Sequence, residues 1–156
     1  MSRGSPTQEQ LALLLQELQR SSDYSVLFNQ MIAARCGIHP TDLKVLGLLS
    51  REGAISAGRI ADLTGLTTGA VTFMIDRLEK AGYARRVRHP TDRRSVLIEL
   101  NREAQGELAH HFVPMDEAMQ RVLAPYSEAE LALILDFMKR SNDAVEQVIT
   151  QARDKP

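Results

Sequence analysis

The sequence predicts a mainly helical fold with a small β wing, in which a winged helix-turn-helix core is flanked by long helices at both ends. Three observations predict it. Two short helical patterns with a tight turn between them occupy residues 57–80, and two strand patterns joined by a charged turn follow at 83–100. Apolar stripes at helical spacing fill both ends of the chain. Because 156 residues suffice for one core, we expect a single domain over 1–156.

The first expected helix runs from about Thr7 to Arg35, and Thr7 with Gln10 forms a capping-box pattern. Such a helix would be about 43 Å long, at ~1.5 Å per residue. That is more than a small domain buries alone, so we expect part of it to contact another subunit. A second helix is expected from Pro40, with His39 in the capping position.

Residues 57–80 carry the helix-turn-helix pattern, in which Ala61 is followed by Gly65 four residues later and by Val71 six residues after that. Gly65 ends the first helix, where a left-handed conformation costs glycine little. Thr67 is the expected N-cap of the second helix. Short polar side chains and one arginine form the expected exposed face of that helix: Thr67, Thr68, Gly69, Thr72, Asp76 and Arg77.

The expected wing consists of strands at 83–88 and 95–100 around the turn 89–94. Residues 77–94 carry seven basic and two acidic side chains, a net charge of +5, whereas residues 101–156 carry six basic and ten acidic ones, a net charge of −4. The whole chain has a net charge of only −1. A basic helix-turn-helix and wing within an acidic frame predict a protein that binds double-stranded DNA.

A further helix is expected after Asn101, with a kink near residues 110–114 because Pro114 removes a backbone hydrogen bond. Ser127 and Glu130 form another capping-box pattern before the last helix. The near-heptad stripes of both ends favour helical dimerisation regions at 7–36 and 101–153, flanking a winged helix-turn-helix at 38–100. The alternative is an intramolecular helix bundle.

In a dimer, two copies would bind a palindrome with half-sites about one DNA turn apart. We expect Thr67, Thr68, Gly69 and Thr72 in the major groove, although Thr67 is equally explained as a helix cap. Arg77 could reach a phosphate or a base. Arg88 is expected at a phosphate with some of its neighbours Arg85 and Arg86, since alternate strand positions point apart.

Three segments together resemble the multiple antibiotic resistance regulator (MarR) family of bacterial transcription factors: GIHPTDLKVLGLL, ISAGRIADLTGLTTGAVTFMIDRLEKAGYARR and HPTDRRSVLIELN. The resemblance covers nearly the whole chain and implies a homodimeric repressor of a palindromic operator, released by a ligand. It also implies that Asp92 supports Arg94, which enters the minor groove, with Arg93 as a second contact. The negative potential of a narrow minor groove attracts arginine independently of any family.

The resemblance further implies a small aromatic or phenolic effector, held between the dimer helices and the DNA-binding core. The residues that it places in this pocket, each of which could instead be plain core, are Tyr24, Phe28, Met31, Ile32, His39, Leu43, His111, Phe112 and Met115. Other relatives sense oxidants through cysteine. Cys36 is the single thiol, and with Arg35 as its only basic neighbour it is as well explained by inert burial.

Several classes of protein have no support in the sequence. No window approaches the roughly 18 apolar residues of a membrane span. The N-terminus lacks the apolar core of a signal peptide, and one cysteine fits a reducing compartment, so we expect a cytoplasmic protein. No enzyme, cofactor or metal motif is present. The remaining alternative is a winged-helix module that binds proteins without contacting DNA, which a salt-dependent mobility shift would distinguish.

Overall fold

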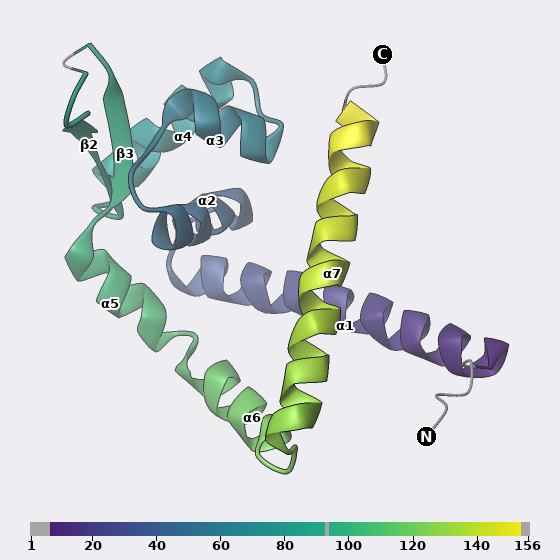
Figure 1. Cartoon of the computed structure of the whole chain (residues 1–156). Helices are drawn as coiled ribbons and strands as arrows, with labels where there is room; N and C mark the ends of the chain where they lie inside the picture. The colour runs from purple at the N-terminus through teal and green to yellow at the C-terminus, as the bar shows by residue number, and fades with distance from the viewer. Residues whose placement is uncertain (1–6, 93, 154–156) are drawn as a thin grey trace.

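The computed structural model describes residues 7–92 and 94–153 and has the predicted mainly helical fold with a small β wing. The elements follow one another as α1 (Gln8–Arg35), α2 (Pro40–Glu52), β1 (Ile55–Ser56), α3 (Ala57–Thr64), α4 (Thr68–Lys80), β2 (Ala84–Arg88), β3 (Val96–Leu100), α5 (Arg102–His110), α6 (Val113–Leu123) and α7 (Glu128–Arg153). Figure 1 shows α2, α3, α4 and the hairpin of β2 and β3 gathered at one end of the molecule. The long helix α1 extends away from them, whereas α7 runs back from the end of α6 to the level of α3 and α4 (Figure 1).

Local sequence signals set the ends of most elements. Thr7 and Gln10 form the predicted capping box at α1, and the side chains of Ser56, Thr67 and Asn101 cap α3, α4 and α5. Gly65, which ends α3, has a φ of 73°, the left-handed conformation predicted for it. These caps satisfy N–H groups that the first turn of a helix leaves without a partner.

The core lies between α2, α3, α4, the inner end of α1 and the sheet. Its fully buried members include Ile32, Leu46, Ile60, Ile75 and Leu78. The sheet has the strand order β1-β3-β2, and all its pairs are antiparallel. As predicted, alternate residues of β3 face the core, where Ile98 and Leu100 are buried, while Val96 lies beyond the core and is exposed. The hairpin is thereby anchored at its base and projects at its tip.

The predicted kink after the wing is a break between two helices. α5 ends at His110 and α6 begins at Val113, with Pro114 in its first turn. Proline fits this position because the first N–H groups of a helix have no partner within the helix. The Phe112 ring at the bend packs edge-on against Phe28 of α1, with 5.6 Å between the two ring centroids.

The outer parts of the long helices are exposed. In α1, residues 8–27 are exposed, and the helix joins the core only near Phe28, Ile32 and Ala33. Residues 128–152 of α7 are exposed apart from Ile134 and Ser141, which are half-buried. Many of the exposed side chains are large and apolar, which marks an association surface. Within the described residues, no helix combines the length and the apolar content needed to cross a membrane.

Candidate nucleic-acid interface

The recognition helix α4 has one packed face and one open face. Its packed face consists of four buried residues: Val71, Met74, Ile75 and Leu78. On the open side, the Thr67 Oγ1 accepts a hydrogen bond from the Ala70 N–H at 3.3 Å, and the Thr72 hydroxyl donates to the Thr68 carbonyl at 2.9 Å. The Thr67 hydroxyl keeps its proton, and the Thr72 oxygen keeps a lone pair. Both groups can still hydrogen-bond outside the protein.

Gly69 lies on this open face without a structural need for glycine. A Cβ atom built at Gly69 meets nothing within 4 Å, and its φ is not positive. Glycine in a helix is unfavourable relative to alanine by about 1 kcal/mol. Neither packing nor backbone conformation therefore explains the residue, whereas close approach of another molecule to the helix does.

Arg77 requires a correction of the sequence-based prediction. Its Nε donates to Asp42 Oδ2 at 2.8 Å and its Nη2 donates to Asp42 Oδ1 at 2.5 Å, and the Asp42 side chain has 0% exposure. Asp42 Oδ2 also accepts from the His39 N–H at 3.3 Å. The hydrogen bond to Asp42 raises the pKa of Arg77. Arg77 is thus engaged with α2 and positions the recognition helix, instead of lying free for a phosphate or a base.

Two of the three wing-strand arginines are engaged within the protein. Arg85 and Glu99 face each other across the hairpin, with 2.5 Å between Nη2 and Oε1. Arg86 pairs with Asp76 at 2.7 Å and with Glu79, both on α4, and the hydrogen bond to Asp76 raises its pKa. Arg88 is exposed and forms no ion pair with any described residue. Of the three, Arg88 is the one whose guanidinium is not engaged by a carboxylate of the described residues.

The wing tip is held by a small hydrogen-bond network. Asp92 Oδ1 accepts from the Arg94 N–H at 3.0 Å, and Asp92 Oδ2 accepts from the Ser95 hydroxyl at 2.5 Å. The hydrogen bond from Ser95 lowers the pKa of Asp92, so the carboxylate stays ionised at neutral pH. Asp92 therefore supports Arg94 through its backbone, leaving an exposed side chain at the tip. Arg93, the second expected contact, lies outside the described residues.

His89 is a wing residue whose role the sequence did not reveal. Its Nδ1 lies 3.3 Å from the Thr91 N–H and 3.2 Å from the Asp92 N–H. Because backbone N–H groups can only donate, Nδ1 must be the acceptor, which places the proton of the neutral ring on Nε2. The imidazole closes the turn much as an Asn side chain does in other turns.

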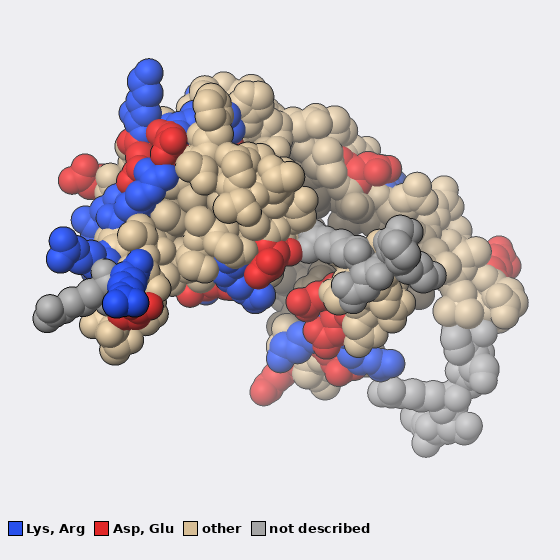
Figure 2. Space-filling view, turned by 90° about the horizontal axis from the view of Figure 1, so that it is seen from above, with Lys and Arg blue, Asp and Glu red and all other residues tan. Residues whose placement is uncertain are grey.

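Basic side chains gather at the wing end of the molecule, where acidic ones lie among them (Figure 2). The internal pairs of Arg85 and Arg86 account for part of this mixture. The net charge of +5 counted for residues 77–94 therefore overstates the number of basic side chains that are free to contact DNA.

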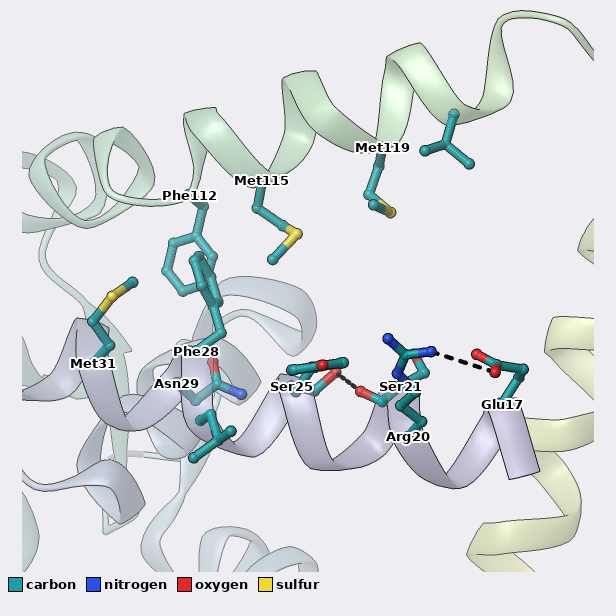
Figure 3. Close-up of a pocket in the computed structure, with 13 residues that line it drawn as sticks. Glu17, Arg20, Ser21, Ser25, Phe28, Asn29, Met31, Phe112, Met115 and Met119 are labelled. Atoms are coloured by element: carbon teal, nitrogen blue, oxygen red, sulfur yellow. Dashed lines mark hydrogen bonds and ion pairs between the residues drawn. The ribbon is translucent and has the colours of Figure 1, made fainter. Parts of the chain in front are cut away.

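A second feature is an open groove of about 1230 Å³ between α1 and α6. Phe112, Met115 and Met119 point across it toward Phe28 and the neighbouring turns of α1 (Figure 3). Its lining is mostly apolar and consists of Glu17, Arg20, Ser21, Tyr24, Ser25, Leu27, Phe28, Asn29, Met31, Phe112, Met115, Met119 and Val122. A groove of this size and character can hold a small aromatic molecule.

The structure brings together only part of the predicted effector pocket. Five of the nine residues that the resemblance placed in this pocket line the groove: Tyr24, Phe28, Met31, Phe112 and Met115. Leu43 is a core residue that lines a neighbouring cavity of about 170 Å³, which shares Phe112 with the groove. His39 precedes α2 and the His111 ring lies tilted beside that of His110, and neither histidine lines the groove. The groove therefore gathers only part of the pocket that the resemblance implied, because Ile32 and Leu43 belong to the buried core and the two histidines lie outside the lining.

Cys36 has the environment of an inert thiol. It is half-buried after α1, and the Tyr83 hydroxyl donates to its carbonyl oxygen at 3.3 Å. Burial raises the pKa of Cys36, which disfavours the reactive thiolate. The structure does not favour the alternative of a redox sensor acting through this residue.

Comparisons with known proteins agree with this geometry. Residues 38–96, which span α2 to the start of β3, match the model of the MarR family. YcgE of Bacillus subtilis, an uncharacterized HTH-type transcriptional regulator, is 38% identical over 129 residues, covering 83% of this chain and 84% of YcgE. The chain belongs to the MarR family. It is accordingly a DNA-binding transcriptional regulator.

Solved structures of the MarR family share its fold. A MarR family protein from Bacillus stearothermophilus superposes with a TM-score of 0.67 at 20% identity, over 90% of this chain and 99% of that one. A mutant MarR from E. coli, crystallised in complex with operator DNA, superposes with a TM-score of 0.54 at 19% identity, over 88% and 99% of the two chains. At these identities the likeness supports the winged-helix fold of the chain.

Proposed function

We propose that this MarR-family regulator is a homodimeric, ligand-responsive repressor that acts in the cytoplasm on a palindromic operator. One observation carries the proposal: the open face of α4 and the exposed Arg94 at the wing tip belong to one rigid unit. β2 packs on α4, and Arg86 joins the two elements through Asp76 and Glu79. A helix and a wing fixed together suit adjacent grooves of one duplex.

Each part of this unit has an assigned partner on the duplex. Thr67, Thr68, Gly69 and Thr72 lie at the first turns of α4 and are assigned to the major groove. The basic wing residues Arg88, Arg93 and Arg94 are assigned to phosphates and the minor groove, with Asp92 holding the turn. Arg77 belongs to the site through its position, because Asp42 fixes it beneath the recognition helix.

The exposed apolar helices support a dimer built from residues 7–36 and 101–153. The first five turns of α1 and nearly all of α7 are exposed, although both carry large apolar side chains. Burial of such surface stabilises association by about 25 cal/mol per Å². A two-fold dimer would present two recognition helices to successive turns of DNA, which is the arrangement that a palindrome requires.

The groove between α1 and α6 is the proposed effector site. Its lining on α1 runs from Glu17, in the exposed part of the helix, to Met31, where the helix reaches the core, and α6 forms the opposite side. A small aromatic or phenolic ligand between them would contact Tyr24, Phe28, Met31 and Phe112. Such a ligand would change how the dimer helices hold the two DNA-binding cores, and release of the operator would follow.

Mobility-shift titrations of genomic fragments at several salt concentrations test the proposal, together with sedimentation of the free protein. We expect a dimer whose affinity falls steeply with salt, and Arg94→Ala should weaken binding strongly without changing helical content. Small aromatic acids should then release the bound fragment. A monomer that binds no fragment even in dilute buffer contradicts the proposal, and favours a module that binds proteins instead.

A further inference from the structure

Phe73 is an apolar ring in the middle of the recognition helix that the protein does not bury. Its exposed fraction is 73%, the largest among the exposed large apolar residues of the described chain. The rings of Phe28 and Phe112 pack against each other, whereas no ring contact involves Phe73 within the described residues. Exposing a phenylalanine to water is unfavourable, so its position needs an explanation.

Dimerisation does not explain this exposure. Almost all other exposed large apolar side chains belong to α1, α6, α7 or the loop at Tyr126, the region proposed for dimerisation. Phe73 and the wing residue Val96 are the exceptions among the described residues, and they belong to α4 and β3, two of the elements proposed to bind DNA. The proposed dimer region therefore does not account for the exposure of Phe73.

The position of Phe73 on α4 indicates which kind of partner would cover it. At 3.6 residues per turn, Gly69, Phe73 and Asp76 follow one another on the side of the helix opposite the buried residues Val71 and Ile75. The Cα–Cβ bond of a helical residue tilts toward the N-terminus, which directs Phe73 over the turn of Gly69. The space beside Gly69 is empty, so the ring and the bare backbone present one apolar surface.

We propose that Phe73 is a specificity-determining residue that contacts the C5-methyl group of a thymine in the major groove. This inference rests on the proposed function, since it requires α4 to enter the major groove of an operator. Thymine alone among the four bases presents a methyl group there, and a phenylalanine ring can read it only by apolar contact. The ring cannot hydrogen-bond to a phosphate, so a contact with the DNA backbone would gain little from it.

The test uses a duplex that the wild-type protein selects from a randomised library. Each thymine of one half-site is replaced in turn by deoxyuridine, which removes only the methyl group. We expect one replacement to weaken wild-type binding about fourfold, the factor that corresponds to one buried methyl-sized group. Phe73→Ala should bind the parent duplex about tenfold more weakly and should not respond to that replacement.

Two further variants make the assignment specific to Phe73. Phe73→Leu keeps an apolar side chain and should retain part of the methyl dependence. His110→Ala removes an exposed side chain of α5, outside the recognition helix and the wing, and it should leave the methyl dependence intact. Binding of all variants to random duplex and their unfolding midpoints should match the wild type, because Phe73 and His110 are both exposed.

The possible failures are distinguishable. If the wild type selects no duplex at all, the proposed function fails and this inference fails with it. If the wild type selects an operator but no thymine shows methyl dependence, the inference alone is overturned. The same holds if the dependence persists in Phe73→Ala or disappears in His110→Ala.

Discussion

The buried carboxylate of Asp42 and the guanidinium of Arg77 form a two-point pair that joins the first turn of α2 to the recognition helix α4. The two N–O distances are 2.8 and 2.5 Å, and the His39 N–H donates to the same carboxylate. The two contacts with Arg77 thus depend on α2 and α4 lying at one fixed separation, whereas the His39 contact is local to the start of α2. The pair sets how far the recognition helix stands out from the core.

The first prediction concerns the stability of the free protein. Arg77→Ala leaves the Asp42 carboxylate buried without its charged partner, so the free energy of unfolding should fall. Removing one partner of a fully buried pair costs about 3–5 kcal/mol, and we expect about 2–3 kcal/mol here because Arg77 is 39% exposed. Urea denaturation at neutral pH measures the loss.

Arg77→Lys serves as the matched control for this prediction. It keeps the charge but cannot form the two-point contact, so its loss should be smaller than that of Arg77→Ala. The double variant, with both Asp42→Ala and Arg77→Ala, should lose less free energy of unfolding than the two single variants lose when their losses are added. Strictly additive losses would show that the two residues do not act as a pair.

The second prediction is that Gly69→Ala changes stability and DNA affinity in opposite directions. The added methyl group meets no atom of the free protein, and alanine is the better helix former. The unfolding midpoint should therefore stay constant or rise. In the complex the same methyl group would lie between α4 and the bases, so affinity for the operator should fall about tenfold or more.

Thermal unfolding and a mobility-shift titration of the same preparation check both halves of that prediction. Gly106→Ala is a suitable control, since Gly106 is likewise helical and open but lies in α5, away from the recognition face. A Gly69→Ala protein with unchanged operator affinity would mean that the backbone of α4 does not approach the bases closely.

The sequence predicted the elements of this fold well because their ends depend on local chemistry. The Thr67 cap, the left-handed Gly65 and the break near Pro114 each follow from side chains within a few residues of the feature. The alternation of β3 and the apolar stripe of α4 likewise follow from simple periodicity. The positions of the DNA-binding elements were therefore predictable before any contact was known.

The charge partners were not predictable in the same way. Asp42 and Arg77 are 35 residues apart, and nothing local marks Arg77 as engaged, so it was assigned to the exposed face. The pair of Arg85 with Glu99 could have been found from the hairpin register, which places them opposite each other. Phe73 escaped notice because an apolar residue on a helix is normally assigned to the core, and only its angular position shows otherwise.

The third prediction compares Arg88, which is free to contact a phosphate of the DNA, with Arg85, which is paired with Glu99. Arg88→Ala should weaken binding to all duplexes similarly and reduce the slope of log affinity against log salt by about one per subunit. Arg85→Ala should change the slope much less, because Glu99 already neutralises that guanidinium. Titrations at four or more salt concentrations measure the slopes, and equal changes for the two variants would contradict the assignment.

The fourth prediction concerns His89, whose Nδ1 accepts hydrogen bonds from the backbone of Thr91 and Asp92. His89→Ala removes the acceptor, so the turn that presents Arg94 should lose its fixed shape. Operator affinity should fall about three- to tenfold, as expected for losing one or two modest hydrogen bonds.

His89→Asn should retain most of the affinity, because a short side-chain carbonyl can accept from the same N–H groups. His110→Ala, which removes an exposed imidazole outside the wing, should bind as the wild type does. Equal losses for the alanine and asparagine variants would show that His89 acts through its ring, by contact with DNA, and not by shaping the turn.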